Sequence, residues 1–406
     1  MFARGDDFVC FEDIESGPQS VPTNLQLGGE GAFAKEAVFD FSRGDHFEDD
    51  LGCLDRERLA MRDARHRVKV TGRETRPRFL GMGSCIGGDT WEDFLMMDPL
   101  NMQGLVAAVV TPMGENGDLH LEVVPQIVDH LEANGITGIY IAGSTGEGMS
   151  LTDDERRAVA EAYVGAAKGR MKTFVQVGHN SLRASADLAG HAEAIGADAV
   201  SATPTGYFKV SGEEELVEGL LPIVEAAPKT PFYYYHIPQL SGVALDPMKL
   251  TDRAMDRLPT FCGIKYSDGG SLHNLPLLEK VGPGLEFLAG SDEAYLMSVA
   301  QGFRSAVGST YNYAAPIYDR VREAVGSGDL QEARLWQSRA LEMIGTMFGT
   351  CGRSSLKVMM QMVGIDCGPS RLPIDPASPE QIAALRKSLE EMGWFDWVGQ
   401  ESKVSA

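Results

Sequence analysis

The 406-residue sequence has few cysteines, and none of them lies in a metal-binding pattern. No two form a Cys-x-x-Cys pair, and no group of cysteine and histidine has the spacing of a zinc site. The six are scattered along the chain: Cys10, Cys53, Cys85, Cys262, Cys351 and Cys367. Such sparse usage is typical of a reducing compartment, so we expect a cytoplasmic protein without a metal centre.

The sequence also lacks long hydrophobic runs and an excess of positive charge. No uninterrupted apolar stretch is long enough for a membrane helix. The segment from Met1 to Ser16 is acidic, whereas secretory and mitochondrial presequences are basic or poor in acids, so neither is predicted. With 36 Lys and Arg against 58 Asp and Glu, the formal charge is −22. This charge argues against nucleic acid or a membrane as a partner.

The chain changes character near residue 100. Before it, hydrophobic periodicity is weak, and an acidic stretch at residues 45–50 is followed by a run of arginines between residues 56 and 78. We expect residues 1–101 to form an N-terminal extension that is largely disordered, with a charged helix over residues 54–69. The basic run is either a solvated segment, as charge blocks usually are, or an interaction arm.

From residue 102 onward, short apolar runs alternate with helical patterns. Such runs are typical of buried parallel strands, which we predict over residues 105–110, 138–142, 173–177, 199–202, 231–237, 261–267, 285–289 and 305–309. Eight repeats of strand and helix over about 250 residues predict an α/β fold, a (β/α)8 TIM barrel, over residues 102–340. Additional C-terminal helices are expected within 341–395, before a tail at 396–406, and the helical patterns lie at 316–348, 354–363 and 379–392.

A doubly wound open sheet is the alternative architecture, because it also alternates strand and helix. Dinucleotide-binding versions of that fold usually carry a Gly-x-Gly-x-x-Gly fingerprint after the first strand. In this sequence Thr111-Pro112-Met113-Gly114 follows the first predicted strand. The missing fingerprint favours the barrel.

Lys265 is the residue that points most directly to a reaction. It lies in the apolar predicted strand at residues 261–267. Burial disfavours the charged form of lysine and lowers its pKa, and a neutral amine can attack a carbonyl carbon to form a Schiff base. On the strand alone an alternative stays open, a lysine at a strand end whose amine reaches solvent.

Three tyrosines and a histidine follow one another in the fifth predicted strand. Alternation along a strand places Tyr233 and Tyr235 on one face and Tyr234 on the other. Strands five and six should be neighbours, so the phenol of Tyr235 is expected near the amine of Lys265, where it can relay a proton. We interpret Tyr233 and Tyr234 as core residues and His236 as a structural histidine.

Polar side chains follow the second, seventh and eighth predicted strands, at the end of the barrel where active sites lie. Ser144 and Thr145 stand in a glycine-rich segment that either holds a carboxylate or forms a simple tight turn. Asp292 and Glu293 either bind sugar hydroxyls or begin a helix. Ser309 either donates to a polyol or caps the next helix.

Together these segments resemble the pyruvate-dependent class I aldolases of the N-acetylneuraminate lyase and dihydrodipicolinate synthase superfamily. The motifs that carry the resemblance stand in family order within residues 103–395, and they are Gly143-Ser144-Thr145-Gly146-Glu147, Tyr235-His236-Ile237-Pro238 and Gly263-Ile264-Lys265. Within the superfamily the sequence is most similar to the N-acetylneuraminate lyases of animals, in residues 233–242, 290–293 and 308–312. Dihydrodipicolinate synthases usually carry an arginine where Leu240 stands, which argues against their reaction.

The resemblance implies an oxo-acid lyase that reversibly cleaves N-acetylneuraminate, a sialic acid, to N-acetylmannosamine and pyruvate. Lys265 would form the Schiff base, Tyr235 would relay the proton, and Ser144 with Thr145 would bind the pyruvate-derived carboxylate. Contacts to the sugar chain would come from Gly290, Asp292, Glu293 and Ser309, and Ser267 stands where lyases often have threonine. The resemblance implies no metal, no cofactor and a homotetramer.

Two loops depart from the family pattern. The segment 203–209 is less aromatic than usual after the fourth strand, with Tyr207 as the candidate for a tyrosine that relatives send across a subunit contact, and Gly178-His179-Asn180 is also unusual. These departures leave room for another aldolase that acts on a 2-keto-3-deoxy sugar acid. A non-catalytic scaffold is a hypothesis of another class, against which Lys265 and Tyr235 argue.

Overall fold

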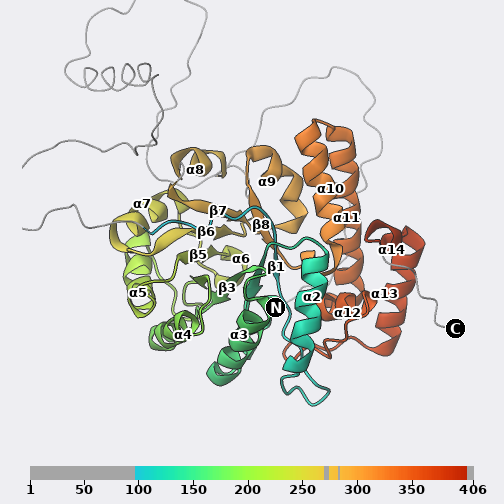
Figure 1. The fold of residues 1–406 in the computed structure, drawn as a ribbon, viewed down its shortest axis with the longest axis horizontal. Coiled ribbons are helices and arrows are strands. Elements are labelled where there is room, and N and C mark those ends of the chain that lie inside the picture. Colours follow the sequence, from blue (N-terminus) through green and yellow to red (C-terminus); the bar gives the residue numbers. More distant parts are fainter. Residues whose placement is uncertain (1–96, 269–273, 282–283, 400–406) are drawn as a thin grey trace, which may run out of the picture. The chain divides into compact units, whose positions relative to one another are not determined.

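The computed structural model describes residues 97–268, 274–281 and 284–399 (Figure 1). Residues 1–96 of the predicted N-terminal extension, its helix at residues 54–69 and residues 400–406 of the predicted tail lie outside the described residues, whereas residues 97–101 are described. The predicted division into extension, barrel, C-terminal helices and tail stays a prediction.

Eight parallel strands close into a barrel, which confirms the predicted TIM barrel. The strands are β1 (Gly104–Ala108), β2 (Gly138–Ile141), β3 (Lys172–Gln176), β4 (Ala199–Ala202), β5 (Phe232–His236), β6 (Phe261–Tyr266), β7 (Glu286–Ala289) and β8 (Ser305–Gly308). Strand β1 pairs with β8, with Leu105 opposite Ala306. This pairing excludes the open doubly wound sheet.

Helices follow the strands and cover the outside of the barrel (Figure 1). They are α2 (Val124–Ala133), α3 (Asp153–Ala167), α4 (Leu182–Ala194), α5 (Glu213–Ala226), α7 (Pro247–Arg257), α8 (Asn274–Val281), α9 (Tyr295–Gln301) and α10 (Tyr311–Ser327). The single turn α6 (Pro238–Ser241) directly follows β5. Single 3-10 turns stand at η2 (Leu121–Val123), η3 (Gly148–Ser150) and η6 (Asp292–Ala294). No helix within the described ranges is long and apolar enough to cross a membrane.

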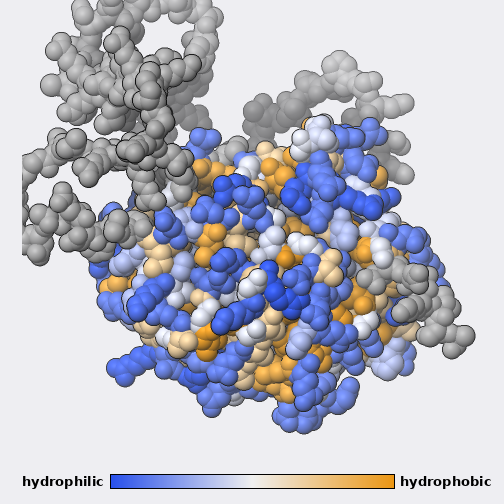
Figure 2. Space-filling view, viewed as in Figure 1, coloured by the Kyte–Doolittle hydropathy of each residue, from blue (hydrophilic) through white to orange (hydrophobic). Residues whose placement is uncertain are grey.

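The C-terminal helices lie on one side of the barrel, where α11 packs against α10 and α13 packs against α11 (Figure 1). They are α11 (Leu330–Cys351), α12 (Ser355–Met362), α13 (Pro379–Met392) and α14 (Trp394–Trp397), with the 3-10 turn η7 (Gly352–Ser354) between α11 and α12. On the face seen in Figure 2, hydrophobic residues gather in separate patches among hydrophilic ones.

The continuous helix predicted over residues 316–348 is wrong, because the chain breaks there into α10 and α11. Gly328 ends α10 with φ of 81°, a left-handed conformation that favours glycine. Asp329 then caps α11, since its carboxylate accepts a hydrogen bond from the backbone N–H of Glu332 at 2.9 Å. The helical periodicity on both sides of Gly328 masked this break.

The barrel interior is aromatic, and the chain before β1 closes its amino end. Tyr233 faces this interior, whereas Tyr234 packs against the surrounding helices, as alternation along β5 predicts. The Tyr233 hydroxyl donates to Glu286 Oε2 at 2.8 Å and accepts from the N–H of Leu100 at 3.0 Å. Residues 97–102 therefore belong to the floor of the barrel.

Candidate active site

Most of the residues predicted to form a site line one cavity of 230 Å³ at the carboxyl ends of the strands. Those present are Ser144, Thr145, Tyr235, Lys265, Gly290, Asp292, Glu293 and Ser309. Ser267 is not among the lining residues; its Oγ lies so close to Gly290 that a Cβ built there would be 2.0 Å away. The barrel thus gathers side chains that are up to 165 positions apart in the sequence, from Ser144 to Ser309.

Lys265 is buried next to Tyr235. The two residues are paired across β5 and β6, and the Lys265 Nζ lies 4.0 Å from the centre of the Tyr235 ring. Only 3% of Lys265 is exposed. Burial lowers the pKa of its amine, and Tyr235 and the carboxyl of Asp292 partly oppose this shift. The alternative of a lysine that reaches solvent is therefore wrong.

The loop of Ser144 and Thr145 is a tight turn whose side chains line the cavity. Ala142 and Glu147, on either side of it, have φ of 53° and 56°, which is unusual for residues other than glycine. Gly148 closes the turn, because a Cβ at this position would lie 1.8 Å from the carbonyl oxygen of Ala142. The segment is therefore a tight turn, and carboxylate binding by Ser144 and Thr145 stays a prediction.

A buried ion pair ties this loop to the C-terminal helices. Glu147 Oε1 lies 2.8 Å from Lys357 Nζ, and each side chain is only 3% exposed. Glu147 Oε2 accepts a further bond from the backbone N–H of Arg371 at 2.8 Å, and Lys357 also donates to the carbonyl of Pro369 at 2.8 Å. Burial lowers the pKa of Lys357, whereas Glu147 opposes this shift. Residues of α12 and the segment after it hold the loop in place.

Asp292 is the buried carboxyl of the site. Its Oδ2 accepts hydrogen bonds from the N–H and the hydroxyl of Thr310, at 3.0 and 2.7 Å. Burial raises the pKa of Asp292, and the two bonds from Thr310 oppose this shift. Gly308 leaves the space that the carboxyl fills, since a Cβ there would lie 1.9 Å from Asp292 Oδ1. Glu293, next to it, is exposed.

His236 packs into the barrel wall. Its ring stacks on that of Tyr266, with the ring centres 5.1 Å apart. Burial lowers the pKa of His236, and the nearby carboxylate of Asp268 opposes this shift. The surroundings agree with a structural histidine.

The sequence did not predict the cavity residues that come from the C-terminal helices. These are Ile344 and Phe348 of α11 and Arg353 of η7. Arg353 donates to the carbonyl of Ser144 at 2.9 Å. This bond connects η7 to the loop of Ser144 and Thr145. No local pattern marks these residues, because their place depends on how α11 packs beside the barrel.

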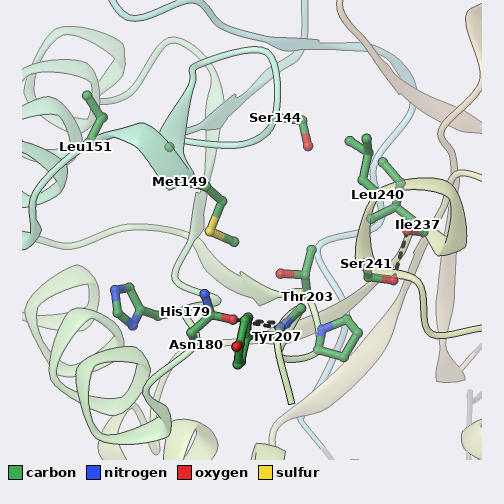
Figure 3. Close-up of a pocket in the computed structure, with 13 residues that line it drawn as sticks. Ser144, Met149, Leu151, His179, Asn180, Thr203, Tyr207, Ile237, Leu240 and Ser241 are labelled. Atoms are coloured by element: carbon green, nitrogen blue, oxygen red, sulfur yellow. Dashed lines mark hydrogen bonds between the residues drawn. The ribbon is translucent and has the colours of Figure 1, made fainter. Parts of the chain in front are cut away.

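A second cavity of 420 Å³ adjoins the first and shares Ser144, Ile237 and Leu240 with it (Figure 3). Its lining includes His179 and Tyr207, from the two loops that depart from the expected pattern. Asn180 joins these loops, because its Oδ1 accepts from the N–H groups of Gly206 and Tyr207 at 3.1 Å each. The unusual loops therefore lie next to the predicted site.

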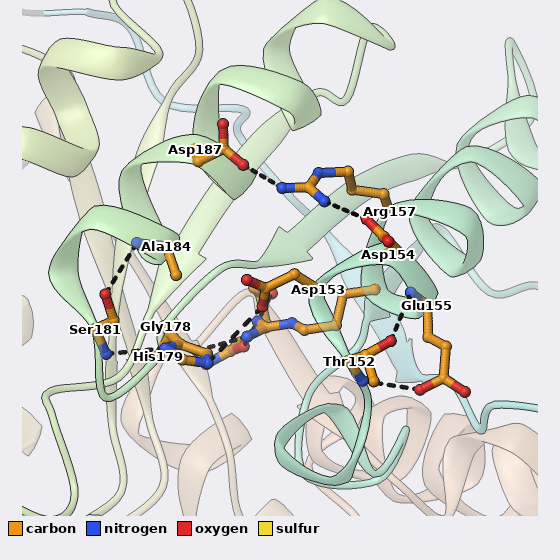
Figure 4. Close-up of polar contacts among 12 residues, drawn as sticks. Thr152, Asp153, Asp154, Glu155, Arg157, Gly178, His179, Ser181, Ala184 and Asp187 are labelled. Atoms are coloured by element: carbon orange, nitrogen blue, oxygen red, sulfur yellow. Dashed lines mark hydrogen bonds and ion pairs between the residues drawn. The ribbon is translucent and has the colours of Figure 1, made fainter.

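The loop after β3 is also fixed to α3 (Figure 4). Arg156 is buried and donates to the carbonyls of Gln176 and Gly178 at 2.6 and 3.0 Å, and burial lowers its pKa to about 10. His179 Nε2 lies 3.8 Å from Asp153 Oδ1. These contacts hold one wall of the second cavity.

Comparisons with known proteins agree with this geometry. The model of the dihydrodipicolinate synthetase family matches residues 101–392. The chain is 37% identical over 303 residues to the N-acetylneuraminate lyase of Rattus norvegicus, which covers 73% of this chain and 95% of the relative. It is 38% identical over 302 residues to the N-acetylneuraminate lyase of Gallus gallus, and the match covers 73% of this chain and 97% of that relative. The solved structure of Proteus mirabilis N-acetylneuraminate lyase superposes with a TM-score of 0.69 at 34% identity and covers 71% of this chain and 98% of that one.

Proposed function

The chain belongs to the dihydrodipicolinate synthetase family, and from this premise we propose that it is an N-acetylneuraminate lyase. It is a class I aldolase that reversibly cleaves the sialic acid to N-acetylmannosamine and pyruvate. The observation that carries the proposal is the buried amine of Lys265, with its lowered pKa, beside Tyr235 in the cavity. The similarity to the N-acetylneuraminate lyases of Rattus norvegicus, Gallus gallus and Homo sapiens, at 37–38% identity, supports the substrate.

Lys265 begins the reaction as a nucleophile. Its neutral amine adds to the keto carbon of the open-chain sugar acid, and loss of water leaves a protonated imine. Ser144 and Thr145 hold the neighbouring carboxylate with hydroxyl and backbone N–H groups. Their turn is supported by the ion pair of Glu147 and Lys357.

Tyr235 moves the proton that allows the carbon–carbon bond to break. The phenol, together with the substrate carboxylate, accepts the proton of the hydroxyl on the β carbon. The bond between the α and β carbons then breaks, its electrons pass into the iminium to form an enamine, and the aldehyde of N-acetylmannosamine leaves. Protonation of the enamine and addition of water release pyruvate and restore the amine of Lys265.

The rest of the cavity binds the sugar chain. Gly290, Asp292, Glu293 and Ser309 line it on the side of β7 and β8, where carboxylates and a hydroxyl suit the hydroxyls of a polyol. Ser267 supports this side from behind Gly290. The reaction as written needs no metal and no separate cofactor.

The functional protein is a cytoplasmic homotetramer. Large hydrophobic residues are exposed around the second cavity, with Met149 at 61%, Leu240 at 58% and Tyr207 at 78% exposure. A subunit contact would cover them and bring Tyr207 close to a neighbouring site. Among the described residues, Cys262, Cys351 and Cys367 are free thiols and buried, which fits a reducing compartment. Analytical ultracentrifugation tests the assembly, and a monomer at micromolar concentration would contradict it.

The experiment that tests the function is a cleavage assay on a panel of keto acids. The protein is incubated with N-acetylneuraminate or with 2-keto-3-deoxy sugar acids, and released pyruvate is measured with a coupled dehydrogenase. We expect the highest kcat/KM for N-acetylneuraminate and no release by Lys265→Ala. Cleavage of the shorter acids alone would replace the proposed substrate, and no pyruvate from any member would contradict an aldolase.

A further inference from the structure

Tyr140 in β2 is a second aromatic residue against the amine of Lys265. It is fully buried and does not line the cavity. Its ring centre lies 3.9 Å from Lys265 Nζ, which is as close as the ring of Tyr235 at 4.0 Å. The two rings meet edge to face, with centres 5.6 Å apart and planes at 73°. The nitrogen therefore lies over two aromatic faces at once.

The position of the Tyr140 ring is set by its neighbours in the barrel. Its hydroxyl donates to Ser201 Oγ in β4 at 2.8 Å, and its ring stacks on Phe174 of β3 with centres 6.3 Å apart. Gly143, in the turn that holds the carboxylate, makes room for the ring, because a Cβ there would lie 2.8 Å from Tyr140 Cε1. Such a ring cannot turn away from the amine without a change in three elements.

An aromatic face attracts a positive charge. The face of the ring carries the negative part of its quadrupole, and the attraction is strongest where water is excluded. A cation within about 6 Å of the ring centre feels it. Both rings meet this distance, and Lys265 is buried. The positive charge at this nitrogen is therefore better stabilised than burial alone would allow.

We propose that Tyr140 is a catalytic residue whose ring face stabilises the iminium formed on Lys265. The inference rests on the proposed function, since it needs a keto acid bound as an imine. In that step the amine nitrogen bonds to the keto carbon and the carbonyl oxygen leaves as water. One hydrogen of the water comes from the amine and the other from solution, so the nitrogen keeps one hydrogen and a positive charge.

This charge is the electron sink of the reaction. The bond between the α and β carbons breaks because its electrons move toward the iminium carbon. Tyr235 has a second task as the proton relay, whereas the hydroxyl of Tyr140 is occupied by Ser201. The structure thus assigns charge stabilisation to Tyr140 and proton transfer to Tyr235.

The test weakens the ring face in steps while its shape stays the same. Tyr140→Phe is prepared first, and then the same site carries difluoro- and trifluorophenylalanine, which progressively cancel the quadrupole. The equilibrium constant for the imine with pyruvate is measured by borohydride reduction and intact mass, at a pH where the amine is neutral in each variant. The matched control carries trifluorophenylalanine at Phe261, which is buried in β6 but packs in the cluster between the sheet and the helices.

We expect Tyr140→Phe to form the imine nearly as well as the native protein. Trifluorophenylalanine at position 140 should weaken it by on the order of tenfold, with the difluoro variant between, and the substitution at Phe261 should change it little. Equal imine formation across the series would overturn the role of Tyr140 and leave the proposed function intact. Absence of any trapped imine in the native protein would overturn both.

Discussion

Two adjacent tyrosines of β5 have opposite surroundings. Tyr235 faces the barrel interior and is paired with Lys265, whereas Tyr234 lies between the sheet and the helices. The Tyr234 hydroxyl is buried and has no hydrogen-bond partner within the part of the chain that the structure describes. Successive residues of a strand point to opposite faces, so Tyr235 lies beside Lys265 whereas Tyr234 does not.

The first prediction compares these two hydroxyls. Tyr235→Phe should lower kcat by roughly 10²–10⁴-fold with little change in KM, because the phenol is needed for proton transfer in the transition state. Tyr234→Phe is the matched control and should keep the native kcat, since it removes a hydroxyl that bonds to no described residue. Steady-state kinetics measure both. A native kcat for Tyr235→Phe would exclude this residue as the proton relay.

The second prediction concerns the pH dependence of stability. Burial lowers the pKa of Lys265 below its ordinary 10.5. Between the two values the unfolded chain binds a proton at this residue that the folded protein lacks, so the free energy of unfolding rises with pH. Lys265→Met removes the contribution of this amine to the pH dependence of the free energy of unfolding. We expect the variant to be the more stable one at neutral pH, with an advantage that shrinks by about 1.4 kcal/mol per pH unit within that window.

Urea denaturation of both proteins over a pH series measures this difference. Other titrating groups are shared by the two proteins and cancel in the comparison. An advantage of Lys265→Met that does not change up to the ordinary lysine pKa would mean that the native amine is not perturbed. The same lowered pKa predicts that kcat/KM falls as the pH falls through it, because the amine must be neutral to attack.

At the scale of elements, the C-terminal helices complete the site. The Glu147–Lys357 ion pair joins the loop after β2 to α12, and Arg353 of η7 bonds to the carbonyl of Ser144. These contacts explain why the cavity needs more than the eight strands and their helices. The C-terminal segment therefore contributes side chains to the cavity and supports one of its loops.

The third prediction removes the cation of this ion pair. Lys357→Met leaves the carboxylate of Glu147 buried without its partner, so we expect a loss of about 3–5 kcal/mol in the free energy of unfolding and a raised KM. The double variant with Glu147→Gln should recover part of the stability, because no unpaired charge remains. Denaturation curves and kinetics measure the two effects.

Lys387 provides the control for this change. It pairs with Glu391 at 3.7 Å on α13, with side-chain exposures of 76% and 68%. Lys387→Met should change stability by less than about 1 kcal/mol, because exposed ion pairs contribute little. A Lys357→Met variant as stable as Lys387→Met would show that the buried pair does not support the loop.

Much of the secondary structure could be predicted from the sequence, because residues at the ends of helices form caps that have a physical cause. Thr152 and Glu155 form a capping box at the start of α3, and Gly302 ends α9 with φ of 99°. Lys265 and Tyr235 were placed side by side by alternation and by the order of strands in a barrel. Tyr140 and Arg353 were not, because their contacts with Lys265 and Ser144 arise only when the barrel closes and α11 packs against it.

At the scale of the whole molecule, the fold begins before the first strand. Leu100 donates its N–H to Tyr233, and the carbonyl of Met97 accepts from the thiol of Cys262 at 3.5 Å. The side chains of Met97 and Leu100 pack against the hydrophobic cluster inside the barrel. Residues 97–102 therefore contribute to the barrel floor.

The fourth prediction compares two truncations. Deletion of residues 2–96 should leave kcat, KM and stability unchanged, since the described residues of the site and of the floor are all retained. Deletion of residues 2–101 also removes Met97 and Leu100, and we expect it to lower the free energy of unfolding by about 2 kcal/mol or more. Slower turnover after the shorter deletion would give the N-terminal extension a part in catalysis.

The central claim is that Lys265 forms an imine with pyruvate, and borohydride reduction tests it most directly. The native protein is mixed with pyruvate, reduced, and analysed by intact mass and then by peptide mapping. The account predicts one added pyruvyl group per chain, located on Lys265 and absent from Lys265→Ala. An unchanged mass, or an adduct on another lysine, would contradict it.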